Sequence, residues 1–133
     1  MKIRINRRAL TFLLCVLFVL VTDGCRNSSE HALTEARATV GGDPQRGRVL
    51  LMRYGCGGCH RIPGVIGAAG KAAPSLEHLS QEPYISGNLP NTPENVIRWI
   101  QFPHSVLPKT KMPEMGVSSA DARDITTYLW SLR

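Results

Sequence analysis

The segment Cys56-Gly57-Gly58-Cys59-His60 carries the residues with the clearest chemistry in the chain. Two thiols separated by two residues, with an imidazole directly after the second thiol, form the pattern at which a c-type haem is attached. Each thiol can add across one haem vinyl group to give a thioether, and the imidazole can then ligate the iron on its proximal side. The segment therefore predicts one covalently bound haem c, with Cys56 and Cys59 as attachment points and His60 as an iron ligand.

Two other chemistries also use closely spaced cysteines. A thioredoxin-like dithiol would stand in a βαβ context, and half of a zinc site would need a second Cys/His pair elsewhere. The sequence contains neither companion, and a dithiol has no need of the histidine that follows Cys59. The spacing therefore favours haem over both alternatives.

A helix is predicted to deliver this segment. Asp43 is a capping side chain, and Pro44 follows it at the first helical position. The residues after them recur at helical spacing, and the inner stripe contains Gly47, Leu50, Leu51 and Tyr54. Because Gly47 lacks a side chain, we expect this helix to cross the last helix closely, near Tyr128.

Two further helices follow the haem motif. Thr92-Pro93 begins the second, and Pro103 ends it. The third begins at Ser118, with Asp121 completing a capping-box pattern, and continues to the end of the chain. The inner stripes of the two helices consist of Val96, Ile97 and Ile100, and of Ala122, Ile125, Leu129 and Leu132.

The stretch from residue 61 to residue 91 is rich in Gly, Pro and Ser and shows no alternation that would favour strands. A loop of this length is unusual in a compact domain. An apolar macrocycle at the centre would let the loops pack on the cofactor, whereas a chain with 6% aromatic residues has a thin core without it. The predicted fold class is therefore all-α, with three main helices and loops wrapped around one covalently bound haem.

The N-terminal residues have the pattern of a targeting segment. A basic stretch precedes an uncharged run from Ala9 to Thr22, so residues 1–24 are predicted to be a signal peptide or a membrane anchor. Cys25 follows and is similar to the acylated cysteine of a bacterial lipobox, although Thr22 and Asp23 depart from that pattern. Residues 25–41 are polar and are predicted to be a flexible tether, and residues 42–133 to be the folded domain.

The basic character of the chain comes mostly from its start. The net charge is +6, but beyond residue 24 the chain has 12 basic and 9 acidic residues and a net charge of +3. A charge of this size, without a basic stripe or a known module, gives no reason to expect nucleic-acid binding. No internal repeat or second haem motif occurs, so we expect one domain with one cofactor.

From Gly42 to Arg133 the chain resembles the class I c-type cytochromes, which are mono-haem proteins with the cytochrome c fold. The haem motif follows the first helix, as in that family. The other matching segments are Ala73-Pro74-Ser75-Leu76, Pro108-Lys109-Thr110-Lys111-Met112-Pro113 and Asp124-Ile125-Thr126-Thr127-Tyr128-Leu129. The stretch from Tyr84 to Asn95, with Arg98-Trp99 after it, is similar to cytochromes and cytochrome domains associated with haem-copper terminal oxidases.

The resemblance implies the remaining site residues. Met112 would be the sixth iron ligand, with Met115 as its nearest rival in the same loop, and the Pro74 carbonyl would accept the ring N–H of His60. Tyr84, Trp99 and Thr110 resemble positions that donate hydrogen bonds to the haem propionates; plain packing in the core is the alternative for each.

The resemblance also implies a function and a compartment. The chain would be an electron carrier without catalytic residues, cycling one haem c between ferric and ferrous states. Its redox partners would be a quinol-oxidising complex or another donor and a terminal oxidase as acceptor. Because such cytochromes receive haem outside the cytoplasm, we expect the periplasmic side of the bacterial inner membrane, with a lipid or N-terminal anchor or in soluble form. A fixed haem-bearing subunit and a small haem enzyme or gas-binding protein are the alternatives.

Overall fold

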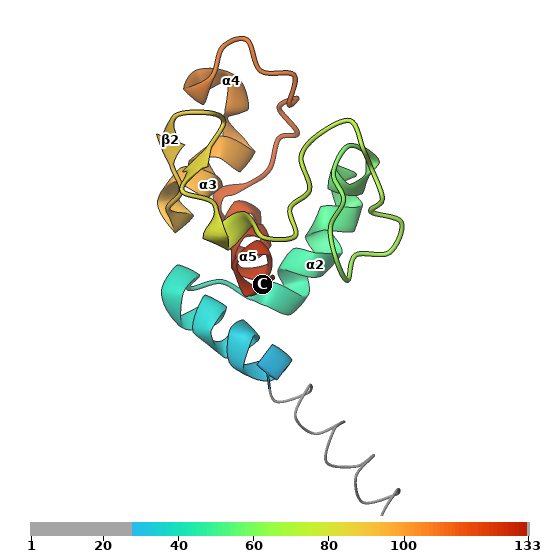
Figure 1. The fold of residues 1–133 in the computed structure, drawn as a ribbon, viewed down its shortest axis with the longest axis vertical. Coiled ribbons are helices and arrows are strands. Elements are labelled where there is room, and N and C mark those ends of the chain that lie inside the picture. Colours follow the sequence, from blue (N-terminus) through green and yellow to red (C-terminus); the bar gives the residue numbers. More distant parts are fainter. Residues whose placement is uncertain (1–27, 133) are drawn as a thin grey trace, which may run out of the picture. The chain divides into compact units, whose positions relative to one another are not determined.

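The computed structural model describes residues 28–132, and three main helices dominate them (Figure 1). These helices are α2 (Pro44–Arg53), α3 (Pro93–Gln101) and α5 (Ser119–Ser131). Each begins where the sequence predicts, because the side chains of Asp43, Thr92 and Ser118 accept backbone N–H groups of the first turn. The expected all-α fold is confirmed.

Helices α2 and α5 cross in close contact, and they form the most extensive contact between elements (Figure 1). Gly47 lies at the crossing, where a Cβ atom would overlap the carbonyl oxygen of Asp124. The close approach was expected, but it occurs one turn before Tyr128, the residue that the sequence pattern indicated. Leu50, Leu51 and Ile125 are buried beside the crossing and form the centre of the core.

A cluster of polar side chains connects α2 to α5 beside this crossing. Arg46 pairs with both Asp121 and Asp124, and the Tyr54 hydroxyl donates a hydrogen bond of 2.7 Å to Asp121. The hydrogen bond from Tyr54 is the main cause that lowers the pKa of Asp121, and Arg46 lowers it further. The ionised form of Asp121, on α5, is therefore bound by Arg46 of α2 and by Tyr54 at the end of that helix.

Replacing Tyr54 by phenylalanine tests this cluster. Since the pKa of Asp121 is lowered in the fold, its stabilisation is present above the ordinary aspartate pKa of about 3.9 and is lost as the pH falls through the lowered value. The Y54F variant should have a lower free energy of unfolding than the wild type at neutral pH, and the two should converge in acid. Urea unfolding at a series of pH values measures this, and a difference that stays constant with pH would contradict the assignment.

Short elements connect the main helices. They are the 3₁₀ turns η1 (Cys56–Gly58) and η2 (Leu79–Gln81), the strands β1 (Tyr84–Ile85) and β2 (Leu89–Pro90), and the helix α4 (Pro103–Val106). The strands form one small antiparallel hairpin, which the sequence pattern did not predict. Its turn contains Ser86 and Gly87, both with positive φ. In strands of two residues each, such turn residues predict a hairpin better than an alternation of apolar and polar side chains does.

Residues 28–40 are helical, which differs from the flexible tether predicted for residues 25–41. The compact unit that contains the three main helices begins at Ala32, ten residues before the expected boundary at Gly42. Ala36 and Val40 are 1% and 5% exposed, so this segment buries apolar side chains of its own. The polar composition indicated a flexible tether, but the burial of these two side chains favours a packed helix.

The predictions for residues 1–24 and for Cys25 lie outside the described residues. Within residues 28–132, no helix is long and apolar enough to span a membrane. The signal or anchor and the lipidation site stay predictions.

Candidate haem-binding site

The haem motif begins directly after α2. Tyr54 ends that helix, Gly55 turns the chain with a φ of 70°, and η1 then places the two cysteines on a single tight turn. The turn is closed by the His60 N–H, which donates to the Cys56 carbonyl at 3.0 Å. Gly55 has room for a side chain but adopts a conformation that strongly favours glycine, so its role is to redirect the backbone.

Both cysteines of the motif are free thiols in the structure. Cys56 is half-buried, and burial raises the pKa of its thiol, whereas Cys59 is exposed. A disulfide between them is absent, which leaves both sulfur atoms available for thioether formation. No group of three or more His, Cys, Asp or Glu side chains in residues 28–132 could hold a metal ion by itself. The zinc interpretation therefore lacks its further ligands among these residues.

The His60 imidazole is fixed by a backbone carbonyl. Its Nδ1 atom lies 2.7 Å from the Pro74 carbonyl oxygen. A carbonyl can only accept, so Nδ1 carries the proton and the neutral ring presents the unprotonated Nε2 to a metal. This contact is the one that the resemblance implied, and it selects the tautomer that an iron ligand requires.

Backbone hydrogen bonds hold Pro74 in place on both sides of this contact. The Ala73 N–H donates to the Cys59 carbonyl at 3.1 Å, and the Leu76 N–H donates to the Arg61 carbonyl at 3.0 Å. The segment containing Pro74 is thus bound to the residues directly before and after His60. Alanine at position 73 is compatible with all of these contacts.

The loop after His60 is closed onto the motif and onto α5. The Gly70 N–H donates to the Gly57 carbonyl at 3.1 Å, and a Cβ atom on Gly57 would approach Ala68 at 2.6 Å. On the other side, the Tyr128 hydroxyl donates to the Pro63 carbonyl at 2.7 Å. Tyr128 therefore anchors the loop that follows the haem motif, a role that its place in the sequence did not reveal.

Met112 lies in a loop that its neighbour Thr110 orders. The Thr110 hydroxyl accepts the backbone N–H of Met112 at 3.1 Å, and the Thr110 N–H donates to the Leu107 carbonyl at 2.9 Å. Both Thr110 and Met112 are half-buried. Since the hydroxyl acts only as an acceptor toward Met112, its proton stays available for a second acceptor.

The other predicted residues differ in burial. Met115, the rival of Met112 in the same loop, is 43% exposed, and so is Met52 on α2. Met112 is therefore the most enclosed methionine of residues 28–132. Trp99 is half-buried and packs against the core, whereas Tyr84 is 58% exposed. Plain core packing therefore does not explain Tyr84. The propionate contacts of Tyr84, Trp99 and Thr110 stay predictions.

Asn91 is a structural residue of this region that the sequence analysis missed. Its side-chain amide donates to the carbonyls of Leu79 and Glu82, at 2.5 and 2.7 Å, and so binds the η2 turn to the start of α3. Asparagine is a common turn residue just before a helix start such as Thr-Pro. Its position in the sequence therefore does not indicate hydrogen bonds to Leu79 and Glu82.

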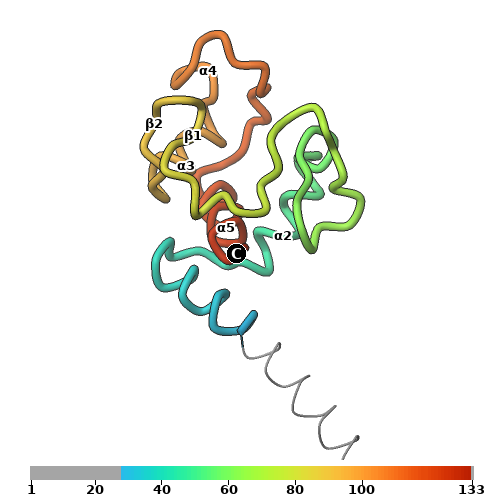
Figure 2. The backbone as a smooth tube through the Cα atoms, in the orientation of Figure 1, coloured from blue at the N-terminus to red at the C-terminus, as the bar shows by residue number. Residues whose placement is uncertain are grey.

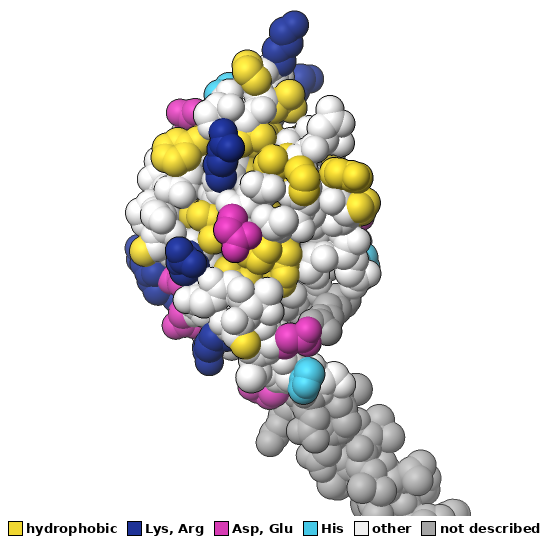
Figure 3. All heavy atoms as spheres, turned by 90° about the vertical axis from the view of Figure 1, so that its left-hand side faces the viewer, with side chains coloured by type: hydrophobic (Ala, Val, Ile, Leu, Met, Phe, Trp, Pro, Cys, Tyr) yellow, Lys and Arg dark blue, Asp and Glu magenta, His cyan; other side chains and the backbone are white. Residues whose placement is uncertain are grey.

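Apolar side chains stay exposed on the segments around the predicted ligands. Hydrophobic side chains gather on the face that carries β1, β2 and α3 (Figure 3). Among the exposed large hydrophobic side chains, Ile66 lies in the loop after His60, and Leu107 and Met115 lie in the segment that contains Met112. Side chains of this kind pack well against a porphyrin, and together with the free thiols and the oriented imidazole they fit a haem group.

The fold and these residues define a small all-α domain suited to hold a haem. A family model described as cytochrome c matches residues 44–133, and the chain belongs to the cytochrome c family. The family implies haem with iron and haem-based electron transfer.

A related protein is cytochrome c oxidase subunit 2 of Alkalihalophilus pseudofirmus. It is 33% identical over 89 residues, which cover 66% of this chain and 25% of the relative. The chain thus matches about a quarter of the length of that relative. No solved structure matches the chain.

Proposed function

We propose that this protein is an electron carrier with one covalently attached haem c, ligated by His60 and Met112, on the periplasmic side of a bacterial inner membrane. The observation that carries the proposal is the contact of 2.7 Å between His60 Nδ1 and the Pro74 carbonyl. This contact leaves Nε2 as the metal-binding atom, directly beside two free thiols. When bound, the haem supplies a one-electron couple between ferric and ferrous iron.

The residues of the chain have separate tasks in this proposal. Cys56 and Cys59 hold the haem through thioethers, and His60 provides a nitrogen ligand in a fixed orientation. Met112 provides a soft thioether ligand, which favours the ferrous state and raises the reduction potential into a carrier's range. Because both axial positions would be filled, the proposal needs no catalytic residue and no substrate site.

The proposed partners are redox proteins. Similarity to an oxidase subunit supports a terminal oxidase as electron acceptor, with a quinol-oxidising complex or another donor. Lys71, Lys109 and Lys111 are exposed, and in the proposal they contribute to weak, salt-sensitive docking. Membrane tethering by an acylated Cys25 or by the N-terminal segment is part of the proposal.

The test is single-turnover oxidation of the ferrous protein by membranes that contain a haem-copper oxidase. We expect rapid oxidation that slows as the salt concentration rises, because docking through exposed charges is screened. Membranes without the oxidase serve as the control. Equal oxidation by both membranes would refute the proposed acceptor, and co-purification in fixed stoichiometry with a membrane complex would favour the fixed subunit over a free carrier.

A second prediction concerns Thr110. The T110V variant removes the acceptor for the Met112 N–H, and a hydrogen bond of this kind contributes about 1 kcal/mol, or roughly a fivefold change in an equilibrium. Carbon monoxide binding to the ferrous protein should therefore become about fivefold more favourable, because the methionine ligand is released more easily. T110S keeps the hydroxyl and should behave as the wild type. Equal behaviour of T110V and the wild type would show that this hydroxyl does not support the ligand.

A further inference from the structure

Residues 32–43 precede the part of the chain that the family model matches, yet they belong to the same compact unit. We call them the N-terminal extension. The helix in the extension ends at Gly41, whose φ of +80° and hydrogen bond from its N–H to the Arg37 carbonyl, at 2.9 Å, form a regular helix stop. A defined end of this kind is expected of a folded element and not of a free tether.

Three hydrogen bonds attach the extension to α5. The Gly42 N–H donates to the Thr127 hydroxyl at 3.1 Å, and the Asp43 N–H donates to Asp124 Oδ1 at 2.8 Å. The Arg123 guanidinium donates to the Val40 carbonyl at 3.3 Å. These contacts use consecutive turns of α5.

The extension also lies in close contact with the surface of α5. A Cβ atom on Gly42 would come within 2.5 Å of the Thr127 hydroxyl and 2.8 Å of Asp124 Oδ1, so only glycine passes here without displacement. Earlier in the extension, the side chains of Ala36 and Val40 are almost completely buried. Hydrogen bonding and apolar burial therefore act on the same segment.

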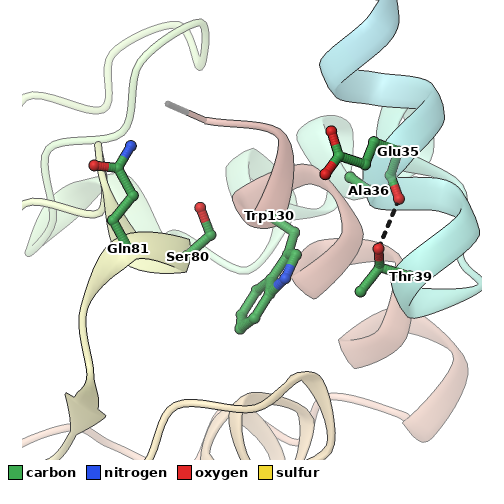
Figure 4. Close-up of a pocket in the computed structure, with 6 residues that line it drawn as sticks. All are labelled: Glu35, Ala36, Thr39, Ser80, Gln81 and Trp130. Atoms are coloured by element: carbon green, nitrogen blue, oxygen red, sulfur yellow. Dashed lines mark hydrogen bonds between the residues drawn. The ribbon is translucent and has the colours of Figure 1, made fainter.

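A hollow of about 420 Å³ borders the extension helix (Figure 4). Glu35, Ala36 and Thr39 line it on one side and Ser80, Gln81 and Trp130 on the other. The gap means that the extension is not packed along its whole length. Its local opening should therefore cost less free energy than global unfolding.

We propose that the N-terminal extension is a docked spacer that fixes the point at which the preceding chain reaches the cytochrome domain. The extension lies at the opposite end of this domain from α4 and the loop that carries Met112 (Figures 1 and 2). If these twelve residues were extended and free, they would lengthen a tether by roughly 40 Å. Because they are docked on the domain, they add no length to any tether formed by the residues before them. This inference rests on the proposed function, which includes a membrane anchor before the domain. It favours a cytochrome domain that is held in a restricted orientation over a domain that swings freely from that anchor.

Hydrogen exchange of the full-length haem protein tests the spacer. In the wild type, backbone amides of residues 36–43 should exchange slowly. The A36D variant places a carboxylate at a site that is 1% exposed, so docking should be lost and these amides should exchange at least about tenfold faster. A38D is the matched control, because Ala38 is exposed on the same helix and the change in helix propensity is the same.

Two outcomes would overturn the spacer: wild-type amides that exchange as fast as those of an unfolded peptide, or equal exchange in A36D and A38D. The visible and near-infrared spectra of the same samples report on the haem and its ligands separately. A wild type without the methionine ligand band would contradict the proposed function, and the exchange data would still decide whether the extension is docked.

Discussion

Replacing Met112 by alanine should open the sixth coordination position of the iron. The ferric protein should lose the weak near-infrared band of methionine ligation, and the ferrous protein should bind carbon monoxide far more readily than the wild type, in which carbon monoxide has to displace the methionine. The reason is that, among the methionines of residues 28–132, Met112 alone is half-buried, and the Thr110 hydroxyl accepts its backbone N–H. Absorption spectra with and without carbon monoxide measure both effects.

The matched control is alanine at Met115, in the same loop. Met115 is 43% exposed, and its replacement should leave the near-infrared band and the carbon monoxide response unchanged. If M115A loses the band and M112A keeps it, the ligand assignment is incorrect. Binding of carbon monoxide by the wild type as readily as by M112A would instead favour a haem enzyme or gas-binding protein.

Replacing Gly47 by alanine should strongly destabilise the fold. In an isolated helix this change would be favourable by up to about 1 kcal/mol. Here the new Cβ atom would overlap the Asp124 carbonyl oxygen, and backbone on both sides of the crossing cannot move away cheaply. We expect a net loss of about 3 kcal/mol, because overpacking of a core typically costs 1–3 kcal/mol and this clash is with backbone.

Gln45 provides the control for this substitution. Its side chain is exposed on the same helix, so Q45A should fold and attach haem as the wild type does. Urea unfolding of the two haem-loaded variants compares them directly. Equal stability of G47A and Q45A would mean that α2 and α5 do not cross as closely as the structure shows.

The helices that position the site could be predicted from short local signals. Asp43-Pro44, Thr92-Pro93 and Ser118 each combine a capping side chain with a helix that buries one apolar stripe, and caps act within a few residues. The haem motif is equally local. The partner of His60 required the resemblance, because a contact between residues 60 and 74 depends on how the intervening loop closes.

The N-terminal extension shows where local reasoning failed. Leu33, Ala36 and Val40 recur at helical spacing, and Gly41 follows as a stop, but the apolar stripe is too weak to be noticed beside so many polar residues. Its attachment uses hydrogen bonds from the Gly42 and Asp43 N–H groups to Thr127 and Asp124, which lie more than 80 residues later in the chain. The hydrogen bond between Tyr128 and Pro63 is another long-range contact of this kind.

The most direct test of the account is the intact mass and visible spectrum of the full-length protein, produced in a host that matures c-type cytochromes. We predict a coloured protein whose mass exceeds that of the polypeptide by one haem, and whose haem stays attached after denaturation because Cys56 and Cys59 hold it through thioethers. A colourless protein from such a host, with both thiols free to react, would contradict the central claim.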